Sequence, residues 1–484
     1  MNYAVNLSAQ ALARVVYVIS GAIVFVLLAR ALGPSRLGEY VFATNLVVVL
    51  AGLADLGSTA ILARDVVAAG DQRATYLANF VMLRLAMGLA VVVPALVTIA
   101  VLAPDGLLVP LVAAGVTIPL IAARFFDPIF QVAGRPWMSL LLSCCYAVAM
   151  IGGTATVVFT SATPAYWAVV VYVACGVLYG AVGLILAQWL MTPSYRSASR
   201  TGVYRIVDAA WPFCIGSLFA MLTARLDVFM LEALGSTTMV GQYNAAFKFV
   251  DLGMAVIVTA LTPLVSIFAG LATANRDALR RAFRAMLHFI ATYSTAIAVL
   301  TPTLSPLVVR VVYGPDYEAA AGTLDVLAWK FWAAFINLLM FATLMTVGSI
   351  RFNWWNSALA LVVNVSANFL LIPALGILGA GISSLVSELV QMAVVLLFLR
   401  AALGSAFDVD WWVRLLGASV CSSALVHAPV DIDRIWLLAP AAFAFLGIMY
   451  ALKAIPANPM RAVQAEVERT PPTVPAPPRE TSGT

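Results

Sequence analysis

Charged residues are scarce in this chain of 484 residues, at 10% against about 25% in a soluble domain. Hydrophobic residues make up 63% of it, which excludes a soluble fold. Its two histidines, His288 and His427, are too few for a histidine-based metal cluster. Its five cysteines show neither a disulfide framework nor zinc-ligand spacing. We therefore expect neither a metal nor a cofactor.

Signatures of nucleotide chemistry and of large outer loops are missing as well. No G-x-x-x-x-G-K-[ST] phosphate loop occurs, which argues against ATP hydrolysis. A membrane polysaccharide polymerase or ligase would need a long outer loop, and the longest one expected is short, near 313–322. The first apolar stretch is long and follows several polar residues, so we expect no cleavable signal peptide. The sequence thus predicts no enzyme and no catalytic residues.

What the chain has in abundance is apolar segments long enough to cross about 30 Å of hydrocarbon as helices. We predict an all-α polytopic membrane protein with about fourteen spans. They lie at 11–32, 39–62, 77–102, 107–132, 138–159, 165–190, 209–234, 241–268, 286–312, 322–347, 352–372, 375–399, 411–427 and 435–452.

Ten ionisable residues lie inside these apolar segments. A charge at the centre of a membrane helix costs roughly 2.5–3.5 kcal/mol on insertion scales, so ten charges need partners or a polar cavity. This pattern indicates a transporter. Arg124 and Asp127 are three residues apart on one helix face, as are Lys248 and Asp251; each pair could be structural or could contact substrate. The ten are Asp55, Arg84, Arg124, Asp127, Arg225, Asp227, Lys248, Asp251, Lys330 and Glu388.

Basic residues are distributed unequally between the two sets of connecting segments. One set, together with the C-terminal tail, holds sixteen Lys and Arg residues, and the opposite set holds four. The positive-inside rule then places both termini in the cytoplasm. Because the arginines have this topological explanation, we expect no nucleic-acid partner.

Two segments are expected to lie outside the bundle. Residues 275–288 alternate apolar and Arg residues at helical spacing, which predicts an amphipathic helix on the anionic cytoplasmic face. The tail at 454–484 is rich in proline and is predicted to be a disordered cytoplasmic segment.

The chain contains an internal repeat. Residues 32–40 and 234–243 both read LG, a short spacer and then GxY, and Gly134-Arg135 is echoed by Gly348 and Arg351. We therefore predict two pseudo-repeated six-helix lobes in parallel orientation, a common basis for alternating access. The expected domains are an N-lobe at 1–195, a cytoplasmic linker at 196–208, a C-lobe at 209–402, two further helices at 403–453, and the tail.

Four motifs carry a resemblance to a known family. They are LARALGPSRLGEY with LADLG (28–40 and 53–57), ARLD with LG and GQY (224–227 and 234–243), YGPDY (313–317) and LIPALGILGA (371–380). In this order and spacing they resemble bacterial polysaccharide flippases of the multidrug/oligosaccharidyl-lipid/polysaccharide exporter superfamily. The similarity runs from about residue 10 to 400. It implies movement of polyprenyl-pyrophosphate-linked sugars from the cytoplasmic to the outer leaflet.

The resemblance and the chemistry of such a substrate suggest roles for the interior residues. Arginine binds phosphate oxygens with a planar fork, so we expect Arg84, Arg124, Arg225, Lys248 and Lys330 to bind substrate. Coupling or cavity roles fall to Asp55, Asp127, Asp227, Asp251, Glu388 and Gln391, with Glu388 nearest the midplane. Arg225 and Asp227 should point to different faces of their helix.

Alternatives remain within the same superfamily. A cation-coupled multidrug exporter shares the two-lobe fold, and the related lipid II flippases share the count of fourteen spans. The expected location is a bacterial cell membrane. The expected partners are lipid-linked oligosaccharide, membrane lipids and polysaccharide assembly proteins.

Overall fold

The computed structural model describes most of the apolar spans. The described residues are 3–55, 62, 72–102, 126, 129–130, 133–192, 199–348, 353–404, 408–426, 438–451 and 459–469. Helix is the regular structure throughout these ranges, which contain no strand, and the predicted all-α class is confirmed. Arg124, Asp127 and most of the predicted span 107–132 lie outside the described residues.

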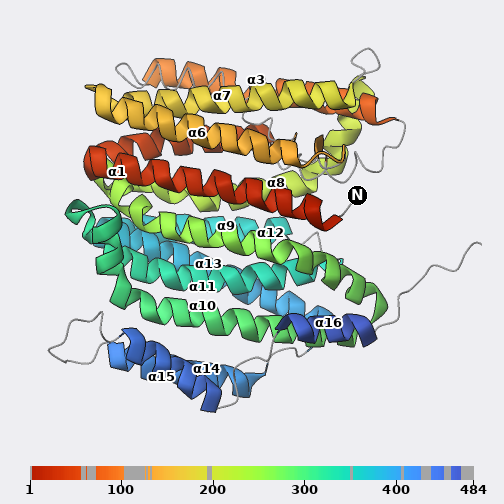
Figure 1. Cartoon of the computed structure of the whole chain (residues 1–484), viewed down its shortest axis with the longest axis vertical. Coiled ribbons are helices and arrows are strands. Elements are labelled where there is room, and N and C mark those ends of the chain that lie inside the picture. The colour runs from red at the N-terminus through yellow and green to blue at the C-terminus, as the bar shows by residue number, and fades with distance from the viewer. Residues whose placement is uncertain are drawn as a thin grey trace, which may run out of the picture. The chain divides into compact units, whose positions relative to one another are not determined.

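Figure 1 shows the described helices, most of which fall on predicted spans. They are α1 (Tyr3–Asp55), α3 (Arg73–Leu102), α6 (Trp137–Thr160), α7 (Pro164–Met191), α8 (Arg200–Leu234), α9 (Thr237–Ala274), α10 (Arg276–Val312), the 3-10 turn η3 (Pro315–Tyr317), α11 (Ala319–Thr346), α12 (Asn353–Leu375), α13 (Ile377–Leu403), α14 (Val409–Val426), α15 (Leu438–Ala451) and α16 (Pro459–Arg469). Within the described residues, eight helices are long and apolar enough to cross a membrane.

Three segments outside the predicted spans contain helix, and the expectation of disorder throughout the tail is wrong. Most of the linker predicted at 196–208 is helical, because α8 already begins at Arg200 with Ser199 as its N-cap. The separate amphipathic helix predicted at 275–288 is the beginning of α10, which continues without a break to Val312. Part of the tail predicted to be disordered forms α16, which packing and an ion pair stabilise.

Helix α1 holds the first two predicted spans and changes direction at Gly33. This residue has φ of 71° and ψ of 172°, a backbone conformation that only glycine adopts without strain. Pro34 follows at once and suits the start of a helix, where a backbone N–H has no partner inside the helix. The turn between the two spans is therefore much shorter than the sequence pattern suggested.

Contacts divide the chain into two compact units. The first comprises Met1–Val256, Ser305–Lys330 and Arg351–Gln391, and the second comprises Ile257–Leu304, Phe331–Ile350 and Met392–Thr484. In the first unit α1 packs against α3, α6, α7 and α8, and α8 also packs along α12 (Figure 1). In the second unit α14 packs against α15.

Three of the motif segments of the sequence come together in the first unit. The hydroxyl of Tyr317 donates a hydrogen bond to the carbonyl of Ala29 (3.1 Å). The side-chain amide of Gln242 donates to the carbonyl of Asp316 (2.6 Å). The turns at 32–40 and 234–243 and the segment 313–317 thus form one structural cluster, although about 280 residues separate the first from the last.

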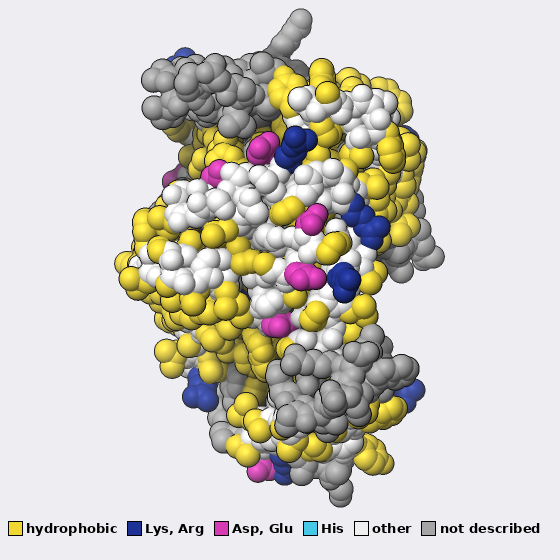
Figure 2. Space-filling view, turned by 90° about the vertical axis from the view of Figure 1, so that its left-hand side faces the viewer, with side chains coloured by type: hydrophobic (Ala, Val, Ile, Leu, Met, Phe, Trp, Pro, Cys, Tyr) yellow, Lys and Arg dark blue, Asp and Glu magenta, His cyan; other side chains and the backbone are white. Residues whose placement is uncertain are grey.

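Large apolar side chains are exposed on many helices, as expected for surfaces that face lipid. Phe159, Leu370 and Phe443 are 82%, 74% and 76% exposed. Figure 2 shows hydrophobic side chains bordering a face on which separate acidic and basic side chains lie among uncharged side chains and backbone. Exposed apolar area on this scale marks a membrane protein rather than a soluble one.

Candidate functional site

A cavity of about 330 Å³ lies within the first unit, between α1, α6, α7, α8 and α9. Its volume is near the lower end of the range for small-molecule sites, about 300–1,000 Å³. The polar and ionisable side chains that line it are Tyr17, Ser20, Tyr40, Thr44, Asn45, Tyr146, Tyr172, Arg225, Asn244, Lys248 and Asp251.

One wall of the cavity is made of tyrosines. Tyr17 and Tyr40 come from the two arms of α1, Tyr146 from α6 and Tyr172 from α7. The rings of Tyr17 and Tyr146 stack with centroids 5.0 Å apart. A tyrosine offers an apolar ring face together with a hydroxyl that donates and accepts hydrogen bonds, so this wall suits a ligand with both kinds of surface.

The ionisable residues of the cavity come from α8 and α9. Arg225 donates a hydrogen bond from Nη1 to Oδ1 of Asn45 (3.2 Å), which fixes the guanidinium beside α1. The ammonium of Lys248 lies 5.5 Å from the ring centroid of Phe25. Asp251 is one turn further along α9 and lines the same cavity. Three of the predicted interior charges are thus brought together here.

Asp227 belongs to a different polar cluster, as its position two residues after Arg225 predicted. Its carboxylate is buried and accepts four hydrogen bonds. Oδ1 accepts from the amides of Asn364 (3.0 Å) and Asn368 (2.8 Å). Oδ2 accepts from the hydroxyls of Tyr243 (2.7 Å) and Ser384. The cluster joins α8, α9, α12 and α13 within the first unit.

Lys330 lies at the edge of this second cluster. Its ammonium donates to the hydroxyl of Ser384 (3.0 Å) and lies 4.6 Å from the ring centroid of Phe247. Ser384 therefore connects a cation to the Asp227 carboxylate. This arrangement favours a charge-balancing role for Lys330, which is not among the residues lining the cavity.

Among the described residues, the other predicted site residues are not part of the cavity lining. Arg84 is 2% exposed and forms an ion pair with Asp55, which holds α3 against α1. Because leaving the buried Arg84 cation without a partner is costly, this pair is best explained as structural. Glu388 and Gln391 are partly buried on α13.

Sequence reasoning missed the tyrosines and the asparagines. The tyrosines were passed over because each is one aromatic in an apolar helix and carries no charge. The two asparagines on α12 did carry a signal, since Asn364 and Asn368 are four apart and share one helix face within a strongly apolar segment.

The cavity can accommodate a small polar group that carries negative charge. Arg225 and Lys248 supply cationic donors, the asparagines supply amides and the tyrosines supply ring faces. Among the described residues, no three His, Cys, Asp or Glu side chains are arranged to hold a metal ion.

Comparison with known proteins gives one family match. The model of the family described as "Polysaccharide biosynthesis protein" matches residues 4–269, which include every element that lines the cavity. No curated protein matches the chain by sequence.

Solved structures share the fold at low identity. A lipid II flippase MurJ in an inward closed conformation is 12% identical and has a TM-score of 0.70, over 93% of this chain and 98% of that one. An inward-facing multidrug resistance MATE family transporter of the MOP superfamily is 16% identical, with a TM-score of 0.65 over 81% and 95% of the two chains. A MOP superfamily transporter from Pyrococcus furiosus is 17% identical, with a TM-score of 0.57 over 83% and 95%.

Proposed function

Because this chain belongs to the polysaccharide biosynthesis protein family and has the fold of MOP superfamily transporters, we propose that it is a flippase. Its substrate would be an oligosaccharide or polysaccharide repeat unit linked to polyprenyl pyrophosphate. The protein would move the polar head group from the cytoplasmic to the outer leaflet by alternating access while the lipid tail stays in the bilayer. No catalytic residue is assigned.

The cavity is the observation that carries this proposal. A pyrophosphate needs cationic donors, and Arg225 and Lys248 lie together where α8 and α9 face α1. A guanidinium can hold two phosphate oxygens at once, whereas Lys248 acts as a point charge. The amides of Asn45 and Asn244 are suited to sugar hydroxyls. Asp251 beside the cations would weaken binding of a compact anion and leaves the site mixed in charge.

Transport against a gradient needs an energy source, and coupling to a proton or another cation falls to the carboxylates inside the apolar segments. We retain Asp227, Asp251 and Glu388 as candidates on the described helices. The cytoplasmic location of both termini also belongs to this proposal and rests on the arginine distribution.

Two related functions remain, a lipid II flippase and a cation-coupled multidrug exporter. The structural match with MurJ covers 93% of this chain and the match with the MATE transporter covers 81%. The broader coverage supports a flippase architecture over a drug exporter.

The proposal can be tested in proteoliposomes that contain a fluorescent polyprenyl-pyrophosphate disaccharide. Chemical quenching from outside measures how much of the probe reaches the outer leaflet. We expect Arg225→Ala to remove transport, and Arg225→Lys to transport weakly because it keeps the charge but loses the fork. Arg310→Ala, at an exposed position on α10, is the matched control. Normal transport by Arg225→Ala would disprove the assignment of this cavity.

A drug-export function makes a different prediction in the same vesicles. Cation-driven movement of a lipophilic cationic dye, without movement of the lipid-linked probe, would replace the flippase by an exporter.

A further inference from the structure

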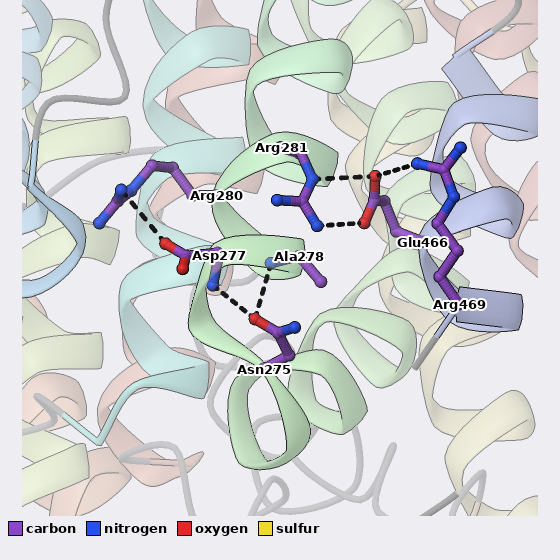
Figure 3. A network of polar contacts seen from close by, with 7 residues as sticks. All are labelled: Asn275, Asp277, Ala278, Arg280, Arg281, Glu466 and Arg469. Carbon is purple, nitrogen blue, oxygen red and sulfur yellow. Dashed lines mark hydrogen bonds and ion pairs between the residues drawn. The ribbon is translucent and has the colours of Figure 1, made fainter. Parts of the chain in front are cut away.

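The C-terminal helix α16 is attached to the beginning of α10 in the second unit through one bidentate ion pair (Figure 3). Nε and Nη2 of Arg281 donate to the two carboxylate oxygens of Glu466, at 3.0 and 2.7 Å. Arg469 of α16 adds a second donor to Glu466 at 3.4 Å. The Glu466 side chain is only 8% exposed, so a carboxylate lies buried in an arginine fork.

The docking of α16 on α10 can be reversed. Helix α16 has 11 residues, and isolated helices of this length are marginal in water. Val463 is its one fully buried side chain among those described, and Arg281 is 55% exposed. A contact that depends on one ion pair with an exposed partner is sensitive to competing anions.

The length of α10 places Arg281 near the membrane surface. The helix has 37 residues and is therefore about 55 Å long, while about 20 residues cross the hydrocarbon. The excess must stand outside at one or both ends. The first three turns carry Arg276, Arg280, Arg281 and Arg284, which hydrocarbon would exclude. This end of α10 thus lies at the level of lipid head groups.

Arg280, next to Arg281 in the sequence, makes different contacts. Arg280 donates from Nε to the carbonyl of Leu403 (2.6 Å) at the end of α13 and also pairs with Asp277 (3.3 Å). Its role is to fix α13 to α10. Arg281 instead directs its fork outward, to a carboxylate that belongs to a separate short helix.

We propose that the Arg281 fork is an anion-binding site with two alternative occupants. Glu466 occupies it when α16 is docked, and the phosphate of an anionic membrane lipid occupies it when α16 is released. The same planar fork fits a carboxylate or a phosphate bidentately. Anionic head groups are also concentrated at such surfaces near basic segments. Helix α16 is then a latch whose position depends on the charge of the surrounding lipid.

Spin-label distances in nanodiscs test this latch on the full chain. The five native cysteines are replaced, and labels are placed at the exposed positions Thr273 and Gln464, at the end of α9 and on α16. In phosphatidylcholine we expect one short distance. In equal parts of phosphatidylcholine and phosphatidylglycerol we expect a longer distance as well, with its population raised several-fold.

Two variants separate the arginine fork from general surface charge. Glu466→Gln removes the anionic occupant, so the longer distance should dominate in both lipids. Exchanging the pair, Arg281→Glu with Glu466→Arg, keeps the attachment but removes the anion site. This double variant should give the short distance in both lipids.

Three results would overturn the proposal. The first is that the native chain gives the same distances in both lipids. The second is that the exchanged pair shows the longer distance in the phosphatidylglycerol mixture, as the native chain does. The third is that inorganic phosphate added in phosphatidylcholine produces the longer distance, which would assign the Arg281 fork to a soluble anion. If inorganic phosphate has no effect and phosphatidylglycerol produces the longer distance, the lipid is supported as the second occupant.

Discussion

Gly38 and Gly241, the second glycines of the two repeated turn motifs, make reciprocal close contacts. A Cβ atom on Gly38 would lie 1.9 Å from the carbonyl oxygen of Thr237, and one on Gly241 would lie 1.9 Å from the carbonyl oxygen of Pro34. Each glycine thus packs on the backbone of the other turn. Such reciprocity is what two repeats related by a pseudo-two-fold axis would produce, and it supports the predicted internal duplication.

We expect Gly38→Ala and Gly241→Ala each to destabilise the protein, because neither backbone carbonyl can yield to the added methyl group. Overpacking of this kind typically costs about 1–3 kcal/mol. Thermal unfolding in detergent and the amount of folded protein on size-exclusion chromatography measure the effect. Gly270→Ala is the control, since its added Cβ would have no atom within 4 Å. Equal stability of all three variants would contradict the close contact.

Asp227→Asn should disturb the buried cluster although the change in volume is small. The carboxylate accepts from four donors, and an asparagine would turn an NH₂ group towards two of them. A buried polar group left unpaired costs about 1–3 kcal/mol. We therefore expect a lower Tm than for Asp251→Asn, which changes a carboxylate in the cavity. A lower Tm for Asp251→Asn than for Asp227→Asn would refute this ranking.

Labelling of single cysteines tests the predicted orientation of the chain. On a cysteine-free background, Thr238→Cys should react with an impermeant reagent added outside intact cells. Thr201→Cys, which lies near the start of α8, should react only after the membrane is made permeable. Both positions are exposed, so access depends on the side of the membrane. The reverse pattern, or the same side for both, would contradict the assignment by arginine distribution.

The attachment of α16 should weaken in acid. Hydrogen bonds from Arg281 lower the pKa of Glu466 from its ordinary value near 4.5. Above the ordinary pKa, the ionised carboxylate contributes its full stabilisation to the docked state. This contribution is lost as the pH falls through the lower pKa that Glu466 has when α16 is docked. In phosphatidylcholine the spin-label distance should therefore stay short from neutral pH to about 5 and lengthen only below that. Lengthening between pH 7 and 6 would point to another group.

Some features of the molecule follow from the sequence alone. Long apolar segments can satisfy their backbone polar groups in lipid only as helices, so composition and segment length determined an all-α membrane protein. Helical geometry also separated Arg225 from Asp227, because residues two apart point to different faces. The predicted disorder of the tail failed at α16, where burial of Val463 and the Glu466 ion pair overcame an unfavourable composition.

Beyond the spacing of Lys248 and Asp251 on one helix, the tertiary structure decided which charges share a site. Arg225, Lys248 and Asp251 meet a wall of tyrosines, whereas Lys330 joins the Asp227 cluster and Arg84 is buried against Asp55. In a soluble helix the apolar face marks the core, but lipid is as apolar as a packed interior. These helices are apolar on all sides, so their sequence does not tell a lipid-facing side from a packed one. Only the packing of the helices shows which of their faces meet in the cavity.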